Sequence, residues 1–246
     1  MDKQEKILKI RCSELGIIMS NPRYTKADND IISAGGWVNK LSESAKTYLR
    51  GKFMQDVYGR KSTIISKYMD KGTIVEDSSI EFLASQLGLG MIMKNEESKE
   101  DEWLTGTADI VLSDEIIDVK NSWSWSTFPL LTEEIPDPKY YWQLQGYMRL
   151  YGKQKSRLVY TLMNTPDELI EKEFKSQKWR LENLGYHVDD EDLWDDVMKD
   201  MTYLDVDDKL RIKTYEIPIN DYDQENMVRR ILQARKYYES LNTLLK

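Results

Sequence analysis

The sequence predicts an α/β fold in which a mixed central β-sheet is flanked by helices. Residues 106–120 (GTADIVLSDEIIDVK) hold two short apolar runs on either side of Ser113-Asp114, a pattern typical of a β-hairpin. Residues 157–163 form another apolar run of strand length, and stretches with helical spacing precede and follow these strands. Because the 246 residues show no internal repeat and no low-complexity linker, we expect one domain.

The composition excludes several kinds of site. The chain has one cysteine, Cys12, and one histidine, His187. An intramolecular disulfide, a four-cysteine metal site, a zinc centre of histidine and cysteine, and a histidine-based nuclease site are therefore excluded. Any metal ion must be bound by oxygen atoms. Since there is no apolar run of about 18 residues and no secretory signal at the start, we expect a cytoplasmic protein.

The net charge of −8 does not exclude a nucleic-acid partner, because the charge is unevenly distributed. Ten acidic residues and one lysine lie between Asp189 and Asp208, and the rest of the chain is close to neutral. Basic clusters at 3–11, 46–52 and 60–71 could neutralise phosphates. We expect the acidic segment to be a solvated helix and loop. A subunit contact and a surface that repels DNA are the alternatives.

The N-terminal residues predict helices separated by a loop. Residues 3–19 carry apolar positions at helical spacing, which predicts one or two helices, broken near Gly16 and ended by Asn21-Pro22. Residues 23–37 are polar and contain two consecutive glycines, so we expect a loop there.

Two more helical segments are predicted before the hairpin. Residues 42–58 predict a helix with Ser42 as N-cap, and helical spacing continues over 61–69 until a break at Lys71-Gly72. The next helix opens at Gly72. It has Glu76 near its start and an inward-facing stripe of Ile80, Phe82, Leu83 and Leu87.

Strands and helices alternate in the rest of the chain. Residues 88–94 predict a short strand, and residues 95–102 a charged loop before the hairpin. After the hairpin the predicted order is a polar aromatic loop (121–131), a helix (139–151) ended by Gly152, a strand (157–163), a helix with Pro166 at its first position up to Gly185, an edge strand (210–217) and an amphipathic helix (222–245).

The hairpin brings two acidic residues together. A two-residue turn at Ser113-Asp114 places Asp109 opposite Asp118, with Lys120 on the same face. Two carboxylates directly opposite each other destabilise a sheet, unless a cation lies between them. Mg2+ prefers carboxylate and carbonyl oxygens, and a neighbouring lysine can hold or polarise a water molecule. The hairpin therefore predicts a metal-dependent phosphodiesterase site, with an ordinary charged surface hairpin as the alternative.

A glutamine on the following helix can complete this site. Gln143 lies one turn before Tyr147, and its amide could point at a metal-bound water or at the scissile phosphate. Gln145 faces another direction, so both glutamines cannot serve. The alternative is that both are exposed on an amphipathic helix.

Taken in chain order, these residues resemble the PD-(D/E)xK nuclease superfamily. The matching pattern is Glu76 on a helix, Gly106-x-x-Asp109, Asp118-x-Lys120 and Gln143-x-x-x-Tyr147. The order and spacing are similar to the RecB-like branch. They are more similar still to the phage lambda exonuclease (YqaJ-like) family, on the stretches 10–23, 72–76 and 140–148. Two departures are Ala108 in place of the usual proline and Asp118 where the lambda pattern has Glu.

The resemblance implies a restriction-endonuclease-like core and a role for each matched residue. The core would span about 70–165 of a single nuclease domain, with N-terminal helices (1–70) that bind DNA ends and a C-terminal part (166–246) of helices and the acidic segment. Lys120 would orient or deprotonate the attacking water, and Gln143 would help to position it. The implied ligands of one or two Mg2+ or Mn2+ ions are Glu76, Asp109, Asp118 and the Val119 carbonyl. The implied DNA contacts are Arg11, Ser13, Arg23, Thr107 and Tyr147, with Ser13 and Thr107 at a terminal 5′-phosphate and Arg23 at the minor groove.

The function implied by this resemblance is a metal-dependent DNA exonuclease. It would process the ends of linear duplex DNA in the 5′→3′ direction during phage recombination, beside a single-strand annealing protein and as a homotrimer. One alternative is a RecB-like nuclease that acts on single strands or as an endonuclease. Another is a non-catalytic DNA-binding or inhibitor protein with the same fold, in which the acidic segment mimics DNA.

Overall fold

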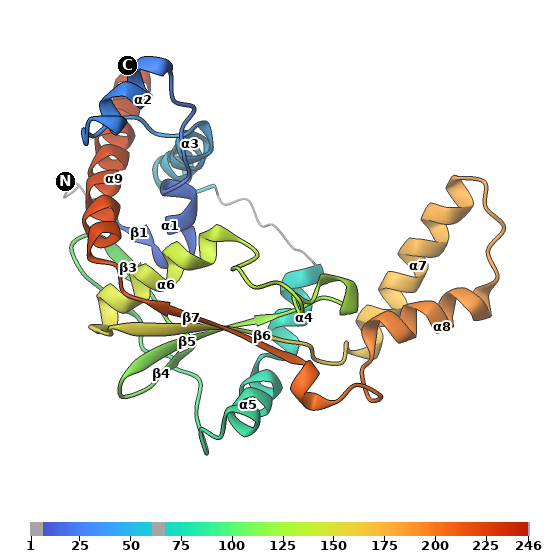
Figure 1. Ribbon diagram of the computed structural model, residues 1–246. Coiled ribbons are helices and arrows are strands. Elements are labelled where there is room, and N and C mark those ends of the chain that lie inside the picture. Colours follow the sequence, from blue (N-terminus) through green and yellow to red (C-terminus); the bar gives the residue numbers. More distant parts are fainter. Residues whose placement is uncertain (1–6, 61–66, 246) are drawn as a thin grey trace.

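Two mixed β-sheets flanked by helices make up the protein, which confirms the predicted α/β class (Figure 1). The structure is a computed structural model that describes residues 7–60 and 67–245. The larger sheet has the order β4-β5-β6-β7, formed by Ile110–Val111, Glu115–Asn121, Lys155–Thr161 and Ile212–Pro218. The smaller sheet has the order β1-β3-β2, formed by Ile10–Arg11, Leu104–Gly106 and Lys99–Glu100. The β5–β6 and β1–β3 pairs are parallel and the other pairs are antiparallel.

The larger sheet is covered on both faces, with α5 (Glu76–Leu87) on one side and α6 (Pro138–Tyr151) on the other (Figure 1). Successive residues of a strand face opposite sides of a sheet. In β5, Ile117 and Val119 accordingly pack with Ile80 and Leu83 of α5. Ile116 faces the other way and belongs to the main core. This alternation places Asp118 on the α6 side.

Three more helices extend the main core beyond α6. These are α1 (Cys12–Ile18), α3 (Glu43–Tyr58) and α9 (Asp221–Ser240), which gather on the α6 side of the larger sheet in Figure 1. The contact between α1 and α6 is close. A Cβ atom added to Gly16 would lie 2.5 Å from the Cα of Lys139. Gly16 is therefore required for helix packing, and the predicted helix break at this position is wrong.

The N-terminal region differs from the prediction in two further ways. Residues 7–9 are not helical, and α1 begins only after strand β1. Where a loop was expected at 23–37, α2 (Lys26–Ser33) is present. It begins with a capping box in which Thr25 and Asp28 bind each other's backbone N–H groups. Ser42 is the N-cap of α3, as predicted. Residues 3–6 and 61–66 of the predicted helices lie outside the described residues.

The predicted break at Lys71-Gly72 is wrong, because α4 (Lys67–Ile74) continues through both residues. Lys71 is buried, and its Nζ donates a hydrogen bond to the Trp123 carbonyl at 2.8 Å. This burial lowers the pKa of Lys71 to about 7. The strand predicted at 88–94 is also wrong. That segment is an irregular loop in which Met91 and Met93 are exposed, so its apolar residues do not form a buried strand.

The C-terminal elements agree well with the prediction. The helix α6 ends at Gly152 in the left-handed conformation, and β7 is an edge strand. The last long helix, α9, ends at Ser240 and is followed by a 3-10 turn (Leu241–Leu245). One boundary shifts, because Pro166 is the N-cap of α7 (Asp167–Asn183) and not its first residue.

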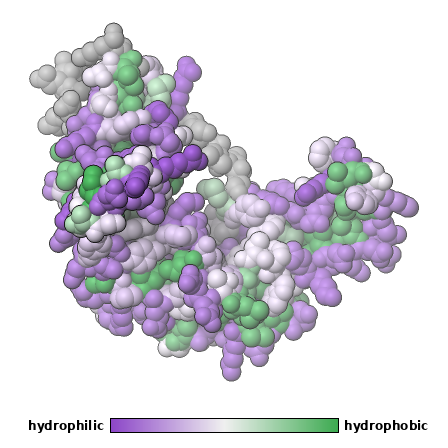
Figure 2. Space-filling view, turned by 45° about the horizontal axis from the view of Figure 1, so that its top comes forward, coloured by the Kyte–Doolittle hydropathy of each residue, from purple (hydrophilic) through white to green (hydrophobic). Residues whose placement is uncertain are grey.

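The acidic segment forms part of a helical arm. Its helix α8 (Asp190–Met201) packs against α7, and the two helices project from the body (Figure 1). Trp179, Leu184 and Tyr186 are exposed on this arm. Figure 2 shows the arm at one side of the molecule, with hydrophobic areas among hydrophilic ones. Within the described residues, none of the helices has the length and apolar character needed to cross a membrane.

Candidate active site

The predicted hairpin has the predicted register. Val111 pairs with Ile116 and Ile110 pairs with Ile117, and the Leu112 N–H binds the Glu115 carbonyl across a two-residue turn. Continued by one more pair, this register places Asp109 opposite Asp118. Asp109 lies just before β4, where its Oδ2 accepts a hydrogen bond of 2.8 Å from the Val119 N–H. The Asp109 side chain is therefore fixed against the backbone of the strand that carries Asp118.

Asp118 is at the centre of the candidate site. Its side chain is 1% exposed, although buried aspartate is rare without a partner. Oδ1 accepts a hydrogen bond of 3.0 Å from Gln143 Nε2. Oδ2 forms an ion pair with Lys120 Nζ at 2.6 Å, and among the described residues it has no other partner. One oxygen of a buried carboxylate is thus left incompletely satisfied.

Lys120 faces the same side of the sheet as Asp118, as predicted. Its Nζ also lies 4.8 Å from the centre of the Tyr140 ring, at a distance typical of a cation–π contact. Burial by itself lowers the pKa of this lysine, but the charges of Asp118 and Asp109 outweigh burial and hold the pKa above its ordinary value. The ammonium group is therefore held between a carboxylate and an aromatic face.

Asp109 is in an environment that disfavours its charge. Burial first and the nearby charge of Asp118 second raise its pKa from 3.8 to about 7, against the smaller lowering effect of Lys120. Repulsion between two close carboxylates is the expected effect of placing them opposite each other on a hairpin. A bound cation would relieve this repulsion.

Glu76 lies near Asp109 and Asp118, but its carboxylate does not form a cluster with theirs. It is the first residue of α5, where a negative charge is favoured by the helix dipole. Its Oε2 binds Lys94 Nζ at 2.5 Å. Across residues 7–60 and 67–245, no three acidic, histidine or cysteine side chains are close enough together to form a metal site.

The residues present nevertheless fit a hard divalent cation. The incompletely satisfied Oδ2 of Asp118, the Asp109 carboxylate opposite it and the adjacent Val119 carbonyl offer oxygen ligands of the type that Mg2+ and Mn2+ prefer. Glu76 could join them by rotating away from Lys94. Two acids and a carbonyl with room for water are typical of sites that bind Mg2+ together with phosphate.

Gln143 reaches the site and Gln145 does not, as predicted. Gln143 Nε2 binds Asp118 and lies 3.2 Å from the Tyr147 hydroxyl. Gln145 binds the backbone before α9 and Gln224 of α9. Both glutamines are buried, so the alternative of two exposed glutamines is wrong.

Of the residues expected to contact DNA, Ser13 and Thr107 lie at one corner beside Tyr147, and Arg23 lies outside this corner. Ser13 is the second residue of α1, and it is exposed. The first residue of that helix, Cys12, lies close to Gly106, next to the exposed Thr107. A Cβ atom at Gly106 would lie 2.9 Å from the Tyr147 ring, so this corner adjoins the candidate site. Arg11 and Arg23 are exposed, and Arg23 lies in the segment between α1 and α2, outside this corner.

The sequence does not predict a set of residues that bind the backbone of Ala108 and Asp109. Asn95 donates its backbone N–H to the Asp109 carbonyl at 2.7 Å and its side-chain amide to the Ala108 carbonyl at 2.9 Å. The Tyr151 hydroxyl accepts a hydrogen bond from the Ala108 N–H and donates one to the Glu97 carbonyl. Nothing in the local sequence signals these contacts, because the residues are 13 to 54 positions apart.

Three solved structures that are similar to this chain are structures of exonucleases. A phage-related exonuclease from Haemophilus somnus 129PT is 28% identical in sequence, with a TM-score of 0.75 and 98% of each chain covered. An alkaline exonuclease, LHK-Exo, from Laribacter hongkongensis is 13% identical, with a TM-score of 0.62 over 96% of this chain and 91% of that one. The same enzyme in complex with dAMP gives a TM-score of 0.61 at 14% identity, over 97% of this chain and 91% of that one.

No protein-family model matches the chain, and neither does any curated protein. The two alkaline exonuclease structures, at their low identity, support the fold. The first similarity extends over nearly the whole of both chains at higher identity. Together with the buried Asp118 and Gln143 and the half-buried Lys120, this first similarity supports a nuclease function.

Proposed function

We propose that this protein is a divalent-metal-dependent deoxyribonuclease that degrades linear duplex DNA from its 5′ ends. The observation that carries the proposal is the arrangement around Asp118, which is buried yet contacts both Lys120 and Gln143 and faces Asp109 across the hairpin. A buried carboxylate that is paired with a lysine and faces a second carboxylate is costly to stability. Such a cost is typical of functional sites.

The proposal gives each residue of the candidate site a role. Asp109, Asp118 and the Val119 carbonyl, with Glu76, would hold one or two Mg2+ or Mn2+ ions. When bound, these ions supply an activated water and stabilise charge on the cleaved phosphate. The Lys120 ammonium can donate hydrogen bonds to that water or to a phosphate oxygen. Gln143 holds Asp118 in place with one amide hydrogen and donates the other to the Tyr147 hydroxyl.

The proposal includes where the DNA binds. Ser13 and Thr107, at the exposed corner beside Tyr147, would receive the terminal 5′-phosphate. Arg11 and Arg23 would add positive charge along the duplex, with Arg23 at the minor groove. The similarity to a protein described as a phage-related exonuclease supports a setting in phage recombination. There the enzyme would act as a homotrimer beside a single-strand annealing protein.

The test is degradation of linear duplex DNA labelled separately at its 5′ and 3′ ends, with Mg2+ and with EDTA. Asp118→Ala and Lys120→Ala should abolish the metal-dependent release of nucleotides. The matched controls are Asp114→Ala and Lys155→Ala, which remove an exposed ion pair of 2.7 Å between the turn of the hairpin and the start of β6. Both should retain activity, because neither side chain reaches the site.

Other outcomes would point elsewhere. Internal cuts, or cleavage of single strands alone, would overturn the duplex-end part of the proposal. The absence of any cleavage with Mg2+ or Mn2+, from protein whose circular dichroism shows that it is folded, would overturn the nuclease function. In that case the fold would serve binding alone.

A further inference from the structure

A second lysine lies beside the candidate metal ligands. Lys94 is on the loop between α5 and β2, and its Nζ donates a hydrogen bond of 2.5 Å to Glu76 Oε2. The two side chains are 39% and 32% exposed, so the pair is reached by solvent. Of the three implied acidic ligands, Asp109 and Asp118 lie opposite each other on the hairpin. Glu76 instead forms an ion pair with Lys94.

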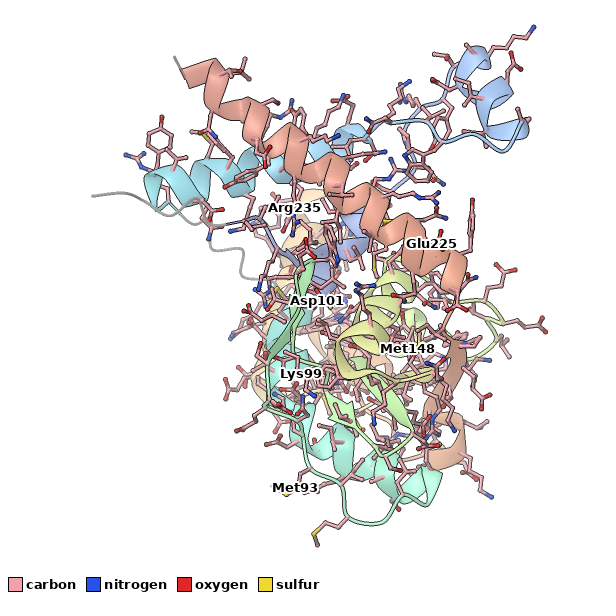
Figure 3. All side chains as sticks on the ribbon, turned by 90° about the vertical axis from the view of Figure 1, so that its left-hand side faces the viewer. Met93, Lys99, Asp101, Met148, Glu225 and Arg235 are labelled. Carbon is pink, nitrogen blue, oxygen red and sulfur yellow. The ribbon has the colours of Figure 1, made fainter. Side chains whose placement is uncertain are left out.

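The position of Lys94 is fixed by its neighbours in the chain. The next residue, Asn95, donates its backbone N–H to the Asp109 carbonyl and its side-chain amide to the Ala108 carbonyl. The residue before it, Met93, projects into solvent in Figure 3. Lys94 is therefore attached to the strand that carries Asp109, and its ammonium lies between that strand and the start of α5.

We propose that Lys94 competes with the divalent cation for Glu76. This inference rests on the proposed function, because Glu76 is a metal ligand only under it. The Lys94 ammonium occupies Glu76 Oε2 and offsets the negative charge that this carboxylate offers to a metal ion, and two cations beside each other repel. The lysine therefore weakens metal binding through Glu76 in the protein without DNA.

A purely structural ion pair would behave differently. Ion pairs between partly exposed groups contribute little to stability, and removal of such a pair has no reason to strengthen binding of a metal ion. Competition predicts the reverse. Loss of the ammonium frees Glu76 and removes one positive charge beside the cation, so metal binding becomes tighter.

The experiment is calorimetric titration of the DNA-free protein with Mn2+ alone. Lys94→Met keeps the length of the side chain and removes its charge, and we expect the dissociation constant to fall by about three- to tenfold, as for loss of one partly screened charge. Lys94→Arg keeps the charge and should bind Mn2+ as the wild type does. Lys99→Met is the matched control, since this lysine lies over the Tyr151 ring and not against Glu76.

The outcomes separate this inference from the proposed function. An unchanged dissociation constant for Lys94→Met, with Mn2+ bound by the wild type, would overturn the role of Lys94 and leave the metal-dependent function in place. An equal tightening by Lys99→Met would also overturn it, because the effect would then come from net charge. If neither the wild type nor Lys94→Met binds Mn2+, the metal-dependent function fails, and the inference fails with it.

Discussion

Replacement of Asp109 by asparagine should stabilise the metal-free protein. Burial and the neighbouring Asp118 raise the pKa of Asp109 from 3.8 to about 7. One pKa unit corresponds to about 1.4 kcal/mol, so ionisation of Asp109 costs the folded protein up to about 4 kcal/mol. Asparagine removes the charge, and its side-chain oxygen can still accept the hydrogen bond from the Val119 N–H. We expect a gain of about 2–4 kcal/mol in the free energy of unfolding at pH 8.

The sign of the effect depends on pH. Below about pH 4 the carboxyl group is protonated in both the folded and the unfolded chain, so Asp109→Asn should change little. Between pH 4 and pH 7 the unfolded chain releases the proton while the folded protein retains it, and the stability of the wild type therefore falls as the pH rises. Above pH 7 both states are ionised, and the advantage of the variant should be constant.

Urea denaturation in EDTA at pH 4, 6 and 8 measures this difference directly. Asp114→Asn is the matched control on the same hairpin. The hydrogen bond from Lys155 holds the pKa of that exposed carboxyl below its ordinary value, so its loss should not stabilise the protein. If Asp109→Asn unfolded at the same or a lower urea concentration than the wild type at pH 8, the charge repulsion inferred for this site would be refuted.

Three further variants test other parts of the fold. Gly16→Ala should destabilise the protein by about 1–3 kcal/mol, because its Cβ would meet the backbone of Lys139, whereas Gly51→Ala, with nothing within 4 Å, should stabilise it by about 0.5–1 kcal/mol. Equal thermal shifts for the two would contradict the close contact of α1 with α6. Tyr151→Phe should lower the free energy of unfolding by about 1–3 kcal/mol and reduce activity. The reason is that the Tyr151 hydroxyl makes hydrogen bonds of 2.6, 3.2 and 3.3 Å beside the candidate site. A variant that unfolds at the same urea concentration as the wild type would contradict this role of the hydroxyl. Lys71→Met should stabilise the protein below pH 7, where the buried ammonium is charged in both states, and this gain should be lost as the pH rises toward 10. A thermal shift that does not vary with pH would argue against a buried charge.

The elements with strong local signals were predictable from the sequence. The two apolar runs around a two-residue turn determine the hairpin register, and with it which acidic residues face each other. Helix α6 has Pro138 at its start and Gly152 directly after its end, both of which act within a few residues. Gln143 and Gln145 were assigned to different directions because helical periodicity alone decides this.

The errors arose where distant residues decide the structure. Gly16 marks a helix break in a local pattern, but here it lets α6 approach α1. Residues 88–94 have the composition of a strand, yet they pair with no strand among the described residues, and Met91 is 98% exposed. The ion pair of Glu76 with Lys94 depends on the path of that loop, so the sequence pattern placed Glu76 correctly at a helix start without showing its partner. Helix α2 did have a local signal, the Thr25 and Asp28 capping box, which was overlooked among polar residues.

Because α9 packs on elements from the start of the chain, the candidate site can be complete only after α9 has been synthesised. In Figure 3, α9 runs across the upper part of the molecule, with Arg235 on the side toward Asp101. Arg235 binds the carbonyl of Leu8, 227 positions earlier, and Gln224 holds α6 through Gln145. A ribosome-bound chain that has exposed the hairpin but not α9 lacks the support for the helix that carries Gln143. Under the proposed function, a chain that lacks α9 would therefore not yet hold Gln143 against Asp118.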